Sequence, residues 1–220
     1  MKFPYAIFDM DGLLFDTERL FLESFETAVS RETGYTFARE KLMQLIGVNG
    51  ETTKKMFPVL FPGCPLSSDG CFAIGHAWMR DYFDTQGMPC KPGAQELLNW
   101  LRERGIPCAL ATSSDRSAAQ SYLARSGLTD YFSVIVSGDQ VKRSKPDPQP
   151  FQLAMQALGA SRPEQCVVFE DSRNGLLAGA NGGFPVILVP DLIDPDEQLP
   201  GLCYAKCRTL KDAIGVLENS

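Results

Sequence analysis

The strongest constraint on the fold is an alternation of short apolar runs with longer stretches of helical periodicity. Apolar runs of strand length lie at residues 5–8, 107–111, 132–136, 166–170 and 185–189. Between the later runs, apolar residues recur at three- and four-residue spacing, which predicts helices over residues 94–104, 116–126, 150–158 and 172–182. This alternation predicts an α/β fold, a Rossmann-like doubly wound parallel sheet with helices on both faces.

One interval interrupts this alternation. About a hundred residues separate the first two apolar runs, far more than a strand-to-helix connection needs. Helical patterns fill the interval at residues 18–33, 38–46, 51–61 and 69–86. We therefore expect a Rossmann-like core of residues 1–15 and 91–220 and a small all-helical cap domain of residues 16–90, inserted after the first strand and joined by hinges near residues 13–16 and 88–93.

Composition and charge exclude several classes of protein. The net charge is −6 and no basic run occurs, which argues against a nucleic-acid partner. No apolar run approaches the roughly 18 residues that span a bilayer, and the first residues lack a signal-peptide pattern, so we expect a cytoplasmic protein without a membrane partner. The seven cysteines form no CxxC pair, which favours structural thiols in a reducing compartment over a disulfide framework.

Polar residues gather directly after the predicted strands. They comprise acids after the first and fourth strands, hydroxyl residues after the second, and a lysine before the helix at 150–158: Asp9, Asp11, Glu170, Asp171, Thr112, Ser113, Ser114 and Lys145. Ligands of doubly wound sheets bind at the carboxyl ends of the strands, so we expect these residues to lie together. Converging carboxylates require a cation, and Mg²⁺ prefers oxygen ligands, while hydroxyls and N–H groups at a helix start suit a phosphate.

Taken separately, several of these residues also have a structural interpretation. Ser114 and Ser172 follow strands and could be helix N-caps. Glu170 and Asp171 could be acids in the first turn of a helix, favoured by its dipole, and Lys145 could be a solvated loop residue. Because all of them are expected at one edge of the sheet, a functional site is the favoured interpretation.

Four segments carry a family resemblance. "DMDGLLFDT", "ATSSD", "SKPDP" and "VVFEDSRNG" resemble, in that order and spacing, the four motifs of the haloacid dehalogenase superfamily, over about residues 5 to 190. The chain is most similar to the helical-cap branch of phosphatases and phosphomutases, and within it to pseudouridine-5′-phosphatase-like and sugar-phosphate phosphatases.

The resemblance implies a role for each core residue. Asp9 would be the nucleophile that forms an aspartyl-phosphate, and Asp11 the general acid and base. Lys145 would neutralise the nucleophile and the phosphoryl group. The Thr112 hydroxyl and the Ser113 amide would bind the phosphoryl oxygens.

The same resemblance implies a Mg²⁺ site and a role for the cap. The ligands would be Asp9, Asp171, Glu170 directly or through water, and Asp11 through its backbone carbonyl. Substrate choice should lie with the cap, where Thr17 and Asn49 are candidate contacts. We expect a Mg²⁺-dependent phosphatase that hydrolyses a small phosphorylated metabolite, a sugar phosphate or a nucleotide-like monophosphate, as a monomer or weak dimer.

Three other functions are compatible with parts of the pattern. Dehalogenation is disfavoured, because dehalogenases of the family lack the acid/base residue at the position of Asp11 and the metal. β-Phosphoglucomutase-like members carry a His at the position of Phe21 and an Arg in the loop that here reads "GVNGET", departures that lean toward a hydrolase. A non-catalytic phosphate-binding regulatory protein would have no need to keep both Asp9 and Asp11.

Overall fold

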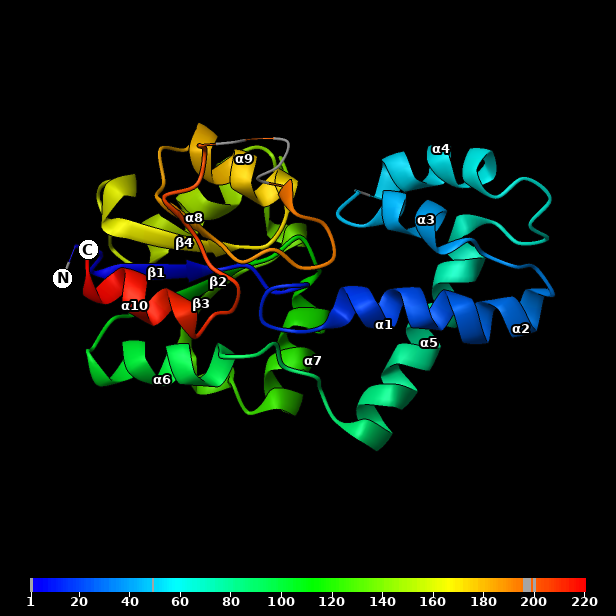
Figure 1. The fold of residues 1–220 in the computed structure, drawn as a ribbon, viewed down its shortest axis with the longest axis horizontal. Helices are drawn as coiled ribbons and strands as arrows, with labels where there is room; N and C mark the ends of the chain where they lie inside the picture. The colour runs from blue at the N-terminus through cyan, green and yellow to red at the C-terminus, as the bar shows by residue number, and fades with distance from the viewer. Residues whose placement is uncertain (1, 49, 196–198, 200) are drawn as a thin grey trace. The chain divides into compact units, whose positions relative to one another are not determined.

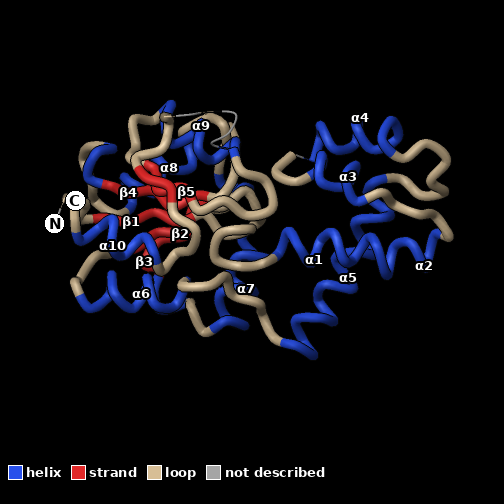
Figure 2. Tube along the Cα trace, in the orientation of Figure 1, coloured by secondary structure: helices blue, strands red, loops and turns tan. Residues whose placement is uncertain are grey.

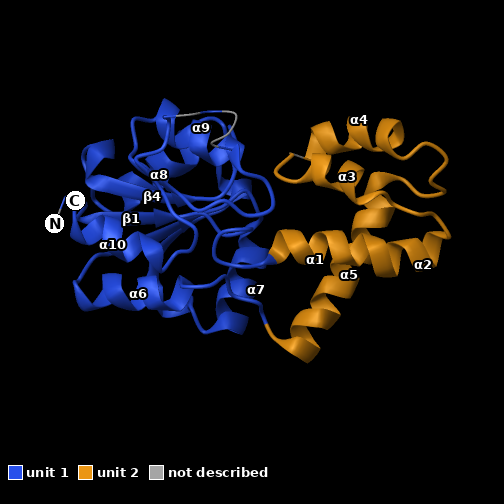
Figure 3. Ribbon diagram, in the orientation of Figure 1, with its two compact units in different colours: residues 1–16, 88–220 blue, residues 17–87 orange. Residues whose placement is uncertain are grey.

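The chain has the α/β architecture that the alternation of strands and helices predicts (Figure 1). The computed structural model describes residues 2–48, 50–195, 199 and 201–220. Two compact units are distinguished (Figure 3): unit 1 comprises Met1–Asp16 and Met88–Ser220, and unit 2 comprises Thr17–Gly87. No helix within the described ranges combines the length and apolar character that crossing a membrane requires.

Unit 1 is built on a parallel sheet with the strand order β3-β2-β1-β4-β5-β6 among the described residues. The strands are β1 Tyr5–Phe8, β2 Cys108–Ala111, β3 Phe132–Val136, β4 Cys166–Glu170, β5 Val186–Leu188 and β6 Ala205–Lys206. The register places Ile7 of the central strand beside Ala109 of β2 and Val168 of β4. The sequence did not predict β6, which has only two residues and one partner strand.

Helices cover both faces of this sheet (Figures 1 and 2). They are α6 Ala94–Glu103, α7 Arg116–Ser126, α8 Gln149–Ala157, α9 Arg173–Asn181 and α10 Asp212–Glu218. Ile7 belongs to a buried cluster with Phe151 of α8 and Leu176 of α9. The next residue along β1, Phe8, points to the opposite face and stacks on Phe169 with ring centroids 4.4 Å apart. Because successive side chains of a buried strand point to opposite faces of the sheet, the strands supply an apolar layer to each face.

The chain crosses out of unit 1 and back at adjacent points. The N–H of Asp16 donates to the carbonyl of Pro89 over 3.0 Å, and the N–H of Lys91 donates to the carbonyl of Leu14 over 2.8 Å. An antiparallel bridge pairs Phe15 with Cys90 between these bonds. Phe15 is fully buried, and its ring meets the edge of Tyr122 on α7 at 6.0 Å. The two crossings are therefore held together as a short antiparallel ribbon.

Unit 2 is helical throughout its described elements. They are α1 Thr17–Ser24, a π-helical turn Phe25–Val29, α2 Ser30–Thr33, α3 Arg39–Leu42, a 3₁₀ turn Met43–Leu45, α4 Gly50–Leu60 and α5 Ser68–Gln86. The helix expected at residues 18–33 is interrupted by the π-helical turn, which the apolar spacing did not indicate. Ser67 caps α5, its hydroxyl accepting from the Gly70 N–H over 3.3 Å.

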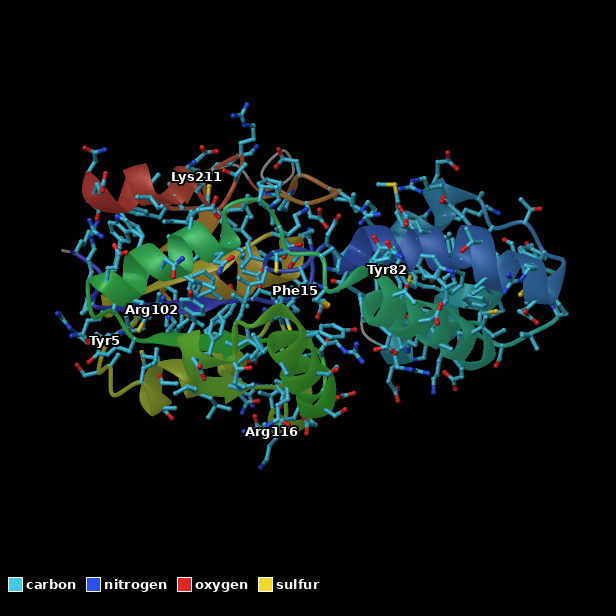
Figure 4. The ribbon with its side chains drawn as sticks, turned by 90° about the horizontal axis from the view of Figure 1, so that it is seen from below. Tyr5, Phe15, Tyr82, Arg102, Arg116 and Lys211 are labelled. Atoms are coloured by element: carbon cyan, nitrogen blue, oxygen red, sulfur yellow. The ribbon has the colours of Figure 1, made fainter. Side chains whose placement is uncertain are left out.

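An aromatic cluster forms the centre of unit 2. The ring of Phe25 is fully buried and lies 4.9 Å from Phe21, 5.2 Å from Phe37 and 5.4 Å from Phe72 between centroids. Pairs at these separations stabilise a core beyond the area that they bury. Further along α5, the ring of Tyr82 lies 5.6 Å from that of Trp78 (Figure 4).

Replacement of Phe25 by Ala tests how much this cluster contributes to stability. Removing a fully buried ring leaves a cavity among its partners, so we expect Phe25→Ala to lower the free energy of unfolding by about 3–5 kcal/mol. Val59→Ala is the control, since that side chain is 78% exposed and its loss should change stability by less than about 0.5 kcal/mol. Urea unfolding followed by circular dichroism measures both; equal effects would contradict the assignment of Phe25 to the core.

Candidate active site

The loop after β1 starts the site. The Asp9 N–H donates to the Phe169 carbonyl over 3.1 Å, so sheet pairing continues one residue past β1 and fixes the Asp9 backbone. The chain then turns sharply through Gly12, whose φ of +78° is unfavourable for other residues. A Cβ at Gly12 would lie 2.4 Å from Asp171 Oδ2, so the glycine also allows the loop to approach β4 closely.

A buried lysine holds two carboxylates together. Lys145 Nζ donates to Asp9 Oδ1 and, over 2.6 Å, to Glu170 Oε1. Lys145 and Asp9 are 9% and 8% exposed, and Glu170 is fully buried. The Lys145 ammonium also lies 4.8 Å from the centre of the Phe151 ring on α8. Its position is therefore fixed by two ionic hydrogen bonds and an aromatic face.

Glu170 is oriented by its own backbone surroundings. Its second oxygen, Oε2, accepts from the N–H groups of Asp171 and Ser172, each over 3.1 Å, and from the Ser172 hydroxyl over 3.0 Å. The space in front of it is kept open by Gly175 on α9, where a Cβ would lie 1.8 Å from Glu170 Cδ. Both carboxylate oxygens are thus engaged by protein donors, which suits a residue that positions Lys145.

The charges at this edge fit a divalent cation. Asp9, Glu170 and Asp171 each offer a carboxylate oxygen, and these oxygens all lie within 4.8 Å of one another. Three carboxylates against the one Lys145 ammonium leave a formal charge of −2 in a buried region. An all-oxygen set of this kind matches the ligands of hard cations. The residues present therefore fit a bound metal ion.

Asp11 is held by hydroxyl groups of the loop after β2. Its Oδ2 accepts from the Ser114 hydroxyl over 2.7 Å and lies 3.5 Å from the Thr112 hydroxyl. Thr112 in turn accepts from the Ser114 N–H over 3.0 Å, so the loop after β2 is shaped to hold the Asp11 carboxylate. The two aspartates of the first motif therefore occupy different environments: one is paired with an ammonium and the other with hydroxyls.

Burial sets the protonation of the central pair. Removal from water raises the pKa of Asp9 to about 7, although the attraction of Lys145 opposes this shift. Burial by itself would lower the pKa of Lys145, but the negative charges of Asp9 and Glu170 outweigh it and raise that pKa above its usual value. Lys145 therefore stays an ammonium at neutral pH and cannot serve as a base.

Among the two serines considered as helix caps, only Ser172 is one. Its hydroxyl accepts from the Gly175 N–H over 3.1 Å at the start of α9. Helix α7 is capped instead by Asp115, which accepts from the Ala118 N–H over 2.8 Å. Ser114 precedes that cap, which leaves its hydroxyl directed at Asp11.

The remaining predicted site residues are distributed as follows. Ser113 is exposed in the loop between β2 and α7. Thr17 is buried at the first position of α1, in unit 2. Asn49 lies outside the described residues. The parts of Thr17, Ser113 and Asn49 in substrate binding remain predictions.

The structure adds Asp191, which the sequence prediction missed. Lys91 Nζ donates to Asp191 Oδ1 and lies 3.8 Å from Asp16 Oδ1. Asp191 Oδ2 comes within 3.2 Å of the position of a Cβ on Gly12. Asp191 follows the fifth apolar run, so the reasoning applied to the other strand ends could have found it.

Comparison with known proteins defines the family. Residues 6–189 match the model of the haloacid dehalogenase-like hydrolases. The chain belongs to this family, which confirms the resemblance of its four motifs.

Two relatives and one solved structure are informative. A Thermotoga maritima protein named "Phosphorylated carbohydrates phosphatase" is 34% identical over 180 residues, 81% of each chain. A Drosophila melanogaster protein named "Probable pseudouridine-5'-phosphatase" is 33% identical, covering 86% of this chain and 83% of the relative. A Thermotoga maritima structure whose name suggests a beta-phosphoglucomutase superposes with a TM-score of 0.80 at 30% identity, covering 98% of both chains.

Gly175→Ala tests the close approach of α9 to Glu170. The added methyl group overlaps the Glu170 carboxyl group, so we expect a loss of about 1–3 kcal/mol in the free energy of unfolding. Gly215→Ala on α10 is the matched control, because no atom lies within 4 Å of its Cβ and alanine favours a helix by up to about 1 kcal/mol. Thermal unfolding of both variants decides the matter, and a Gly175→Ala variant as stable as Gly215→Ala would refute the contact.

Asp9→Asn tests the raised pKa in metal-free protein. Because the folded pKa of about 7 exceeds the ordinary 3.8, the stability that Asp9 contributes is fully present below about pH 3.8 and is lost as pH rises through 7. Asn carries no charge, so the melting temperature of Asp9→Asn should rise relative to that of the wild type between pH 5 and pH 8. We expect a rise of at least roughly 2 °C, which corresponds to about 1 kcal/mol in a chain of this size. Calorimetry in the presence of a chelator measures this rise. Asp130→Asn, a substitution at an exposed position, is the control and should show no such rise.

Proposed function

We propose that this protein is a Mg²⁺-dependent phosphatase that hydrolyses monoesters of small phosphorylated metabolites through an aspartyl-phosphate on Asp9. The observation that carries the proposal is the separation of the two aspartates of one motif. Asp9 is buried beside Lys145 and the oxygens of Asp171 and Glu170, while Asp11 is held by the Ser114 hydroxyl. One carboxylate is thus placed for attack beside the Lys145 ammonium, and the other is placed for proton transfer.

The reaction divides into two displacements. In the first, an Asp9 oxygen attacks phosphorus, the bond from phosphorus to the ester oxygen breaks, and Asp11 gives that oxygen its proton as the alcohol leaves. In the second, Asp11 takes a proton from water as the water oxygen attacks phosphorus, which releases phosphate and restores the Asp9 carboxylate. Ser114 keeps the Asp11 carboxylate oriented through both steps.

The fixed charges lower the barrier of both steps. Lys145 remains an ammonium and neutralises the Asp9 carboxylate and the phosphoryl oxygens, while Glu170 keeps the ammonium in place. Asp9, Asp171, the backbone carbonyl of Asp11 and Glu170, directly or through water, would hold Mg²⁺, which would supply the positive charge that favours the ionised Asp9 carboxylate and balances the phosphate. Thr112 and Ser113 are the proposed phosphate-binding residues.

The substrate class follows from the relatives. Two of them are named for phosphorylated carbohydrates and for pseudouridine 5′-phosphate, and an Escherichia coli relative at 29% identity is named for fructose 1-phosphate. We therefore propose a sugar phosphate or a nucleotide-like monophosphate, selected by the helical cap of residues 16–90 through contacts such as Thr17 and Asn49. A cytoplasmic location and a monomeric or weakly dimeric state remain predictions from the sequence.

A second candidate function is sugar phosphomutation. The superposition with the Thermotoga maritima structure favours it. Against it, the side chain at position 21 is a phenylalanine whose ring lies 5.4 Å from that of Phe72, so it packs within unit 2 and cannot carry a proton. Incubation with hexose 1-phosphates and a bisphosphate activator separates the two reactions, since a mutase yields an isomeric sugar phosphate and a phosphatase yields free phosphate.

Substitution of the two aspartates tests the proposed mechanism. We expect Asp9→Asn to lower kcat/KM by at least about 1,000-fold and Asp11→Asn by about 10²–10⁴-fold, because the first removes the nucleophile and the second the proton carrier. Asp16→Asn, in the same segment but paired with Lys91, is the control and should keep activity within a few-fold. The assay is phosphate release from p-nitrophenyl phosphate, sugar phosphates and pseudouridine 5′-phosphate with Mg²⁺.

Two outcomes would overturn this assignment. One is a folded Asp9→Asn variant that retains the wild-type rate on its best substrate. The other is a wild-type protein that releases no phosphate from any member of the panel with or without Mg²⁺, which would favour a phosphate-binding regulatory protein.

A further inference from the structure

Two cysteines of unit 2 lie in sulfur contact. Cys64 Sγ and Cys71 Sγ are 3.7 Å apart. Their backbones are held by local hydrogen bonds, since the Cys64 N–H donates to Phe61 over 3.2 Å and the Cys71 N–H donates to Ser67 over 3.0 Å. A disulfide bond is about 2.0 Å long, so the sulfurs need to approach by only roughly 1.7 Å to be joined.

The two sulfurs differ in access. Cys71 lies in the first turn of α5 and is fully buried. Cys64 lies in the turn after α4, is half-buried, and lines a cavity of about 370 Å³ together with Phe57, Phe61 and Leu66. Cys64 is therefore open to small-molecule reagents in the cavity, whereas the buried Cys71 does not line it.

The protonation of the pair agrees with this order. Burial, with a smaller contribution from the neighbouring Cys64, raises the pKa of the Cys71 thiol to about 12. Cys71 thus remains a thiol at neutral pH, in contact with Cys64 Sγ. The thiolate is the attacking species in disulfide exchange, so Cys64 is the sulfur placed to react first.

We propose that Cys64 and Cys71 form a reversible dithiol–disulfide couple that reacts with low-molecular-weight disulfides entering the cavity beside Cys64. All residues of the couple belong to unit 2, and none belongs to the proposed catalytic set. In a reducing compartment the pair would be dithiol at rest and oxidised transiently, the usual behaviour of such pairs in cytosolic proteins.

The exchange balances in two steps. The Cys64 thiolate attacks one sulfur of the small disulfide RSSR, which forms a mixed disulfide and releases one thiolate RS⁻. Cys71 then gives up its proton and attacks Cys64 Sγ, which forms the Cys64–Cys71 bond and releases the second RS⁻. The two protein thiols are oxidised, the small disulfide is reduced to two RSH once the two protons are taken up, and any excess of small thiol reverses the sequence.

Thiol counting in glutathione buffers tests the proposal. The full-length protein is equilibrated with oxidised and reduced glutathione at several ratios, quenched in acid, denatured, alkylated with iodoacetamide and weighed by mass spectrometry. As the oxidised fraction rises, Cys64 and Cys71 of the wild-type protein should lose their alkylatable thiols together, and peptide mapping should place a bond between these two of the seven cysteines. Dithiothreitol should restore all seven.

Three variants define the order of attack. Cys71→Ala should trap one glutathione on Cys64, whereas Cys64→Ser should leave Cys71 unmodified. Cys90→Ser is the matched control, because Cys90 is exposed and belongs to unit 1, and it should lose the same two thiols as the wild type. Circular dichroism spectra confirm that each variant is folded, and the wild-type peptide map decides the proposal even if a variant is not.

Three results would overturn the proposal. The first is a wild-type protein in which Cys64 and Cys71 both stay alkylatable at every ratio. The second is a lasting glutathione adduct on wild-type Cys64, which would show that Cys71 does not resolve it. The third is a disulfide that joins any other pair of cysteines.

Discussion

The buried ammonium group of Lys145 is the interaction on which the candidate site depends. It lies between the carboxylates of Asp9 and Glu170, whose like charges repel one another strongly where water is excluded. Removing one member of such a buried set costs about 3–5 kcal/mol, because the remaining charges are left uncompensated. Lys145 comes from the loop before α8, and the carboxylates come from the neighbouring strands β1 and β4. The ion pairs therefore fix a loop to the sheet edge as well as balancing charge.

The same burial creates a requirement that the chain alone does not meet. The nucleophile that we propose must be an ionised carboxylate, yet removal from water raises the pKa of Asp9 to about 7. Asp171 adds a further negative charge to this edge, so one lysine is not enough. A divalent cation at the three acids satisfies both needs, since it favours the ionised carboxylate and offsets the excess charge. The same arrangement thus costs stability in the metal-free protein at neutral pH and would support the proposed reaction once a metal ion is bound.

The sequence predicted the parts of the fold that depend on local pattern. Five strands and the parallel sheet follow from short apolar runs between amphipathic stretches, and the gathering of Asp9, Thr112 and Asp171 follows from strands that end at one edge. Strand β6 escaped prediction because two residues carry no periodicity, and its pairing with β5 is a tertiary event.

Details that depend on three-dimensional proximity could not be predicted from the sequence. Ser114 and Asp115 are adjacent and both are good N-caps, so only the position of Asp11 across the sheet edge decides which one caps α7. Similarly, the spacing of Cys64 and Cys71 fits no motif, and their contact arises from the way the turn after α4 meets the start of α5.

The paired crossings between the two units have an evolutionary consequence. The chain segments that leave and re-enter unit 1 are joined by backbone hydrogen bonds from Asp16 to Pro89 and from Lys91 to Leu14. These bonds require no particular side chains. Insertions are tolerated where the ends of the inserted segment lie close together. Residues 17–87 can therefore be replaced by a different helical insertion at this ribbon. The acid cluster, Lys145 and the sheet would keep their geometry. If substrate choice lies with residues 17–87, as proposed, natural selection can change the recognition of metabolites without having to rebuild the chemistry.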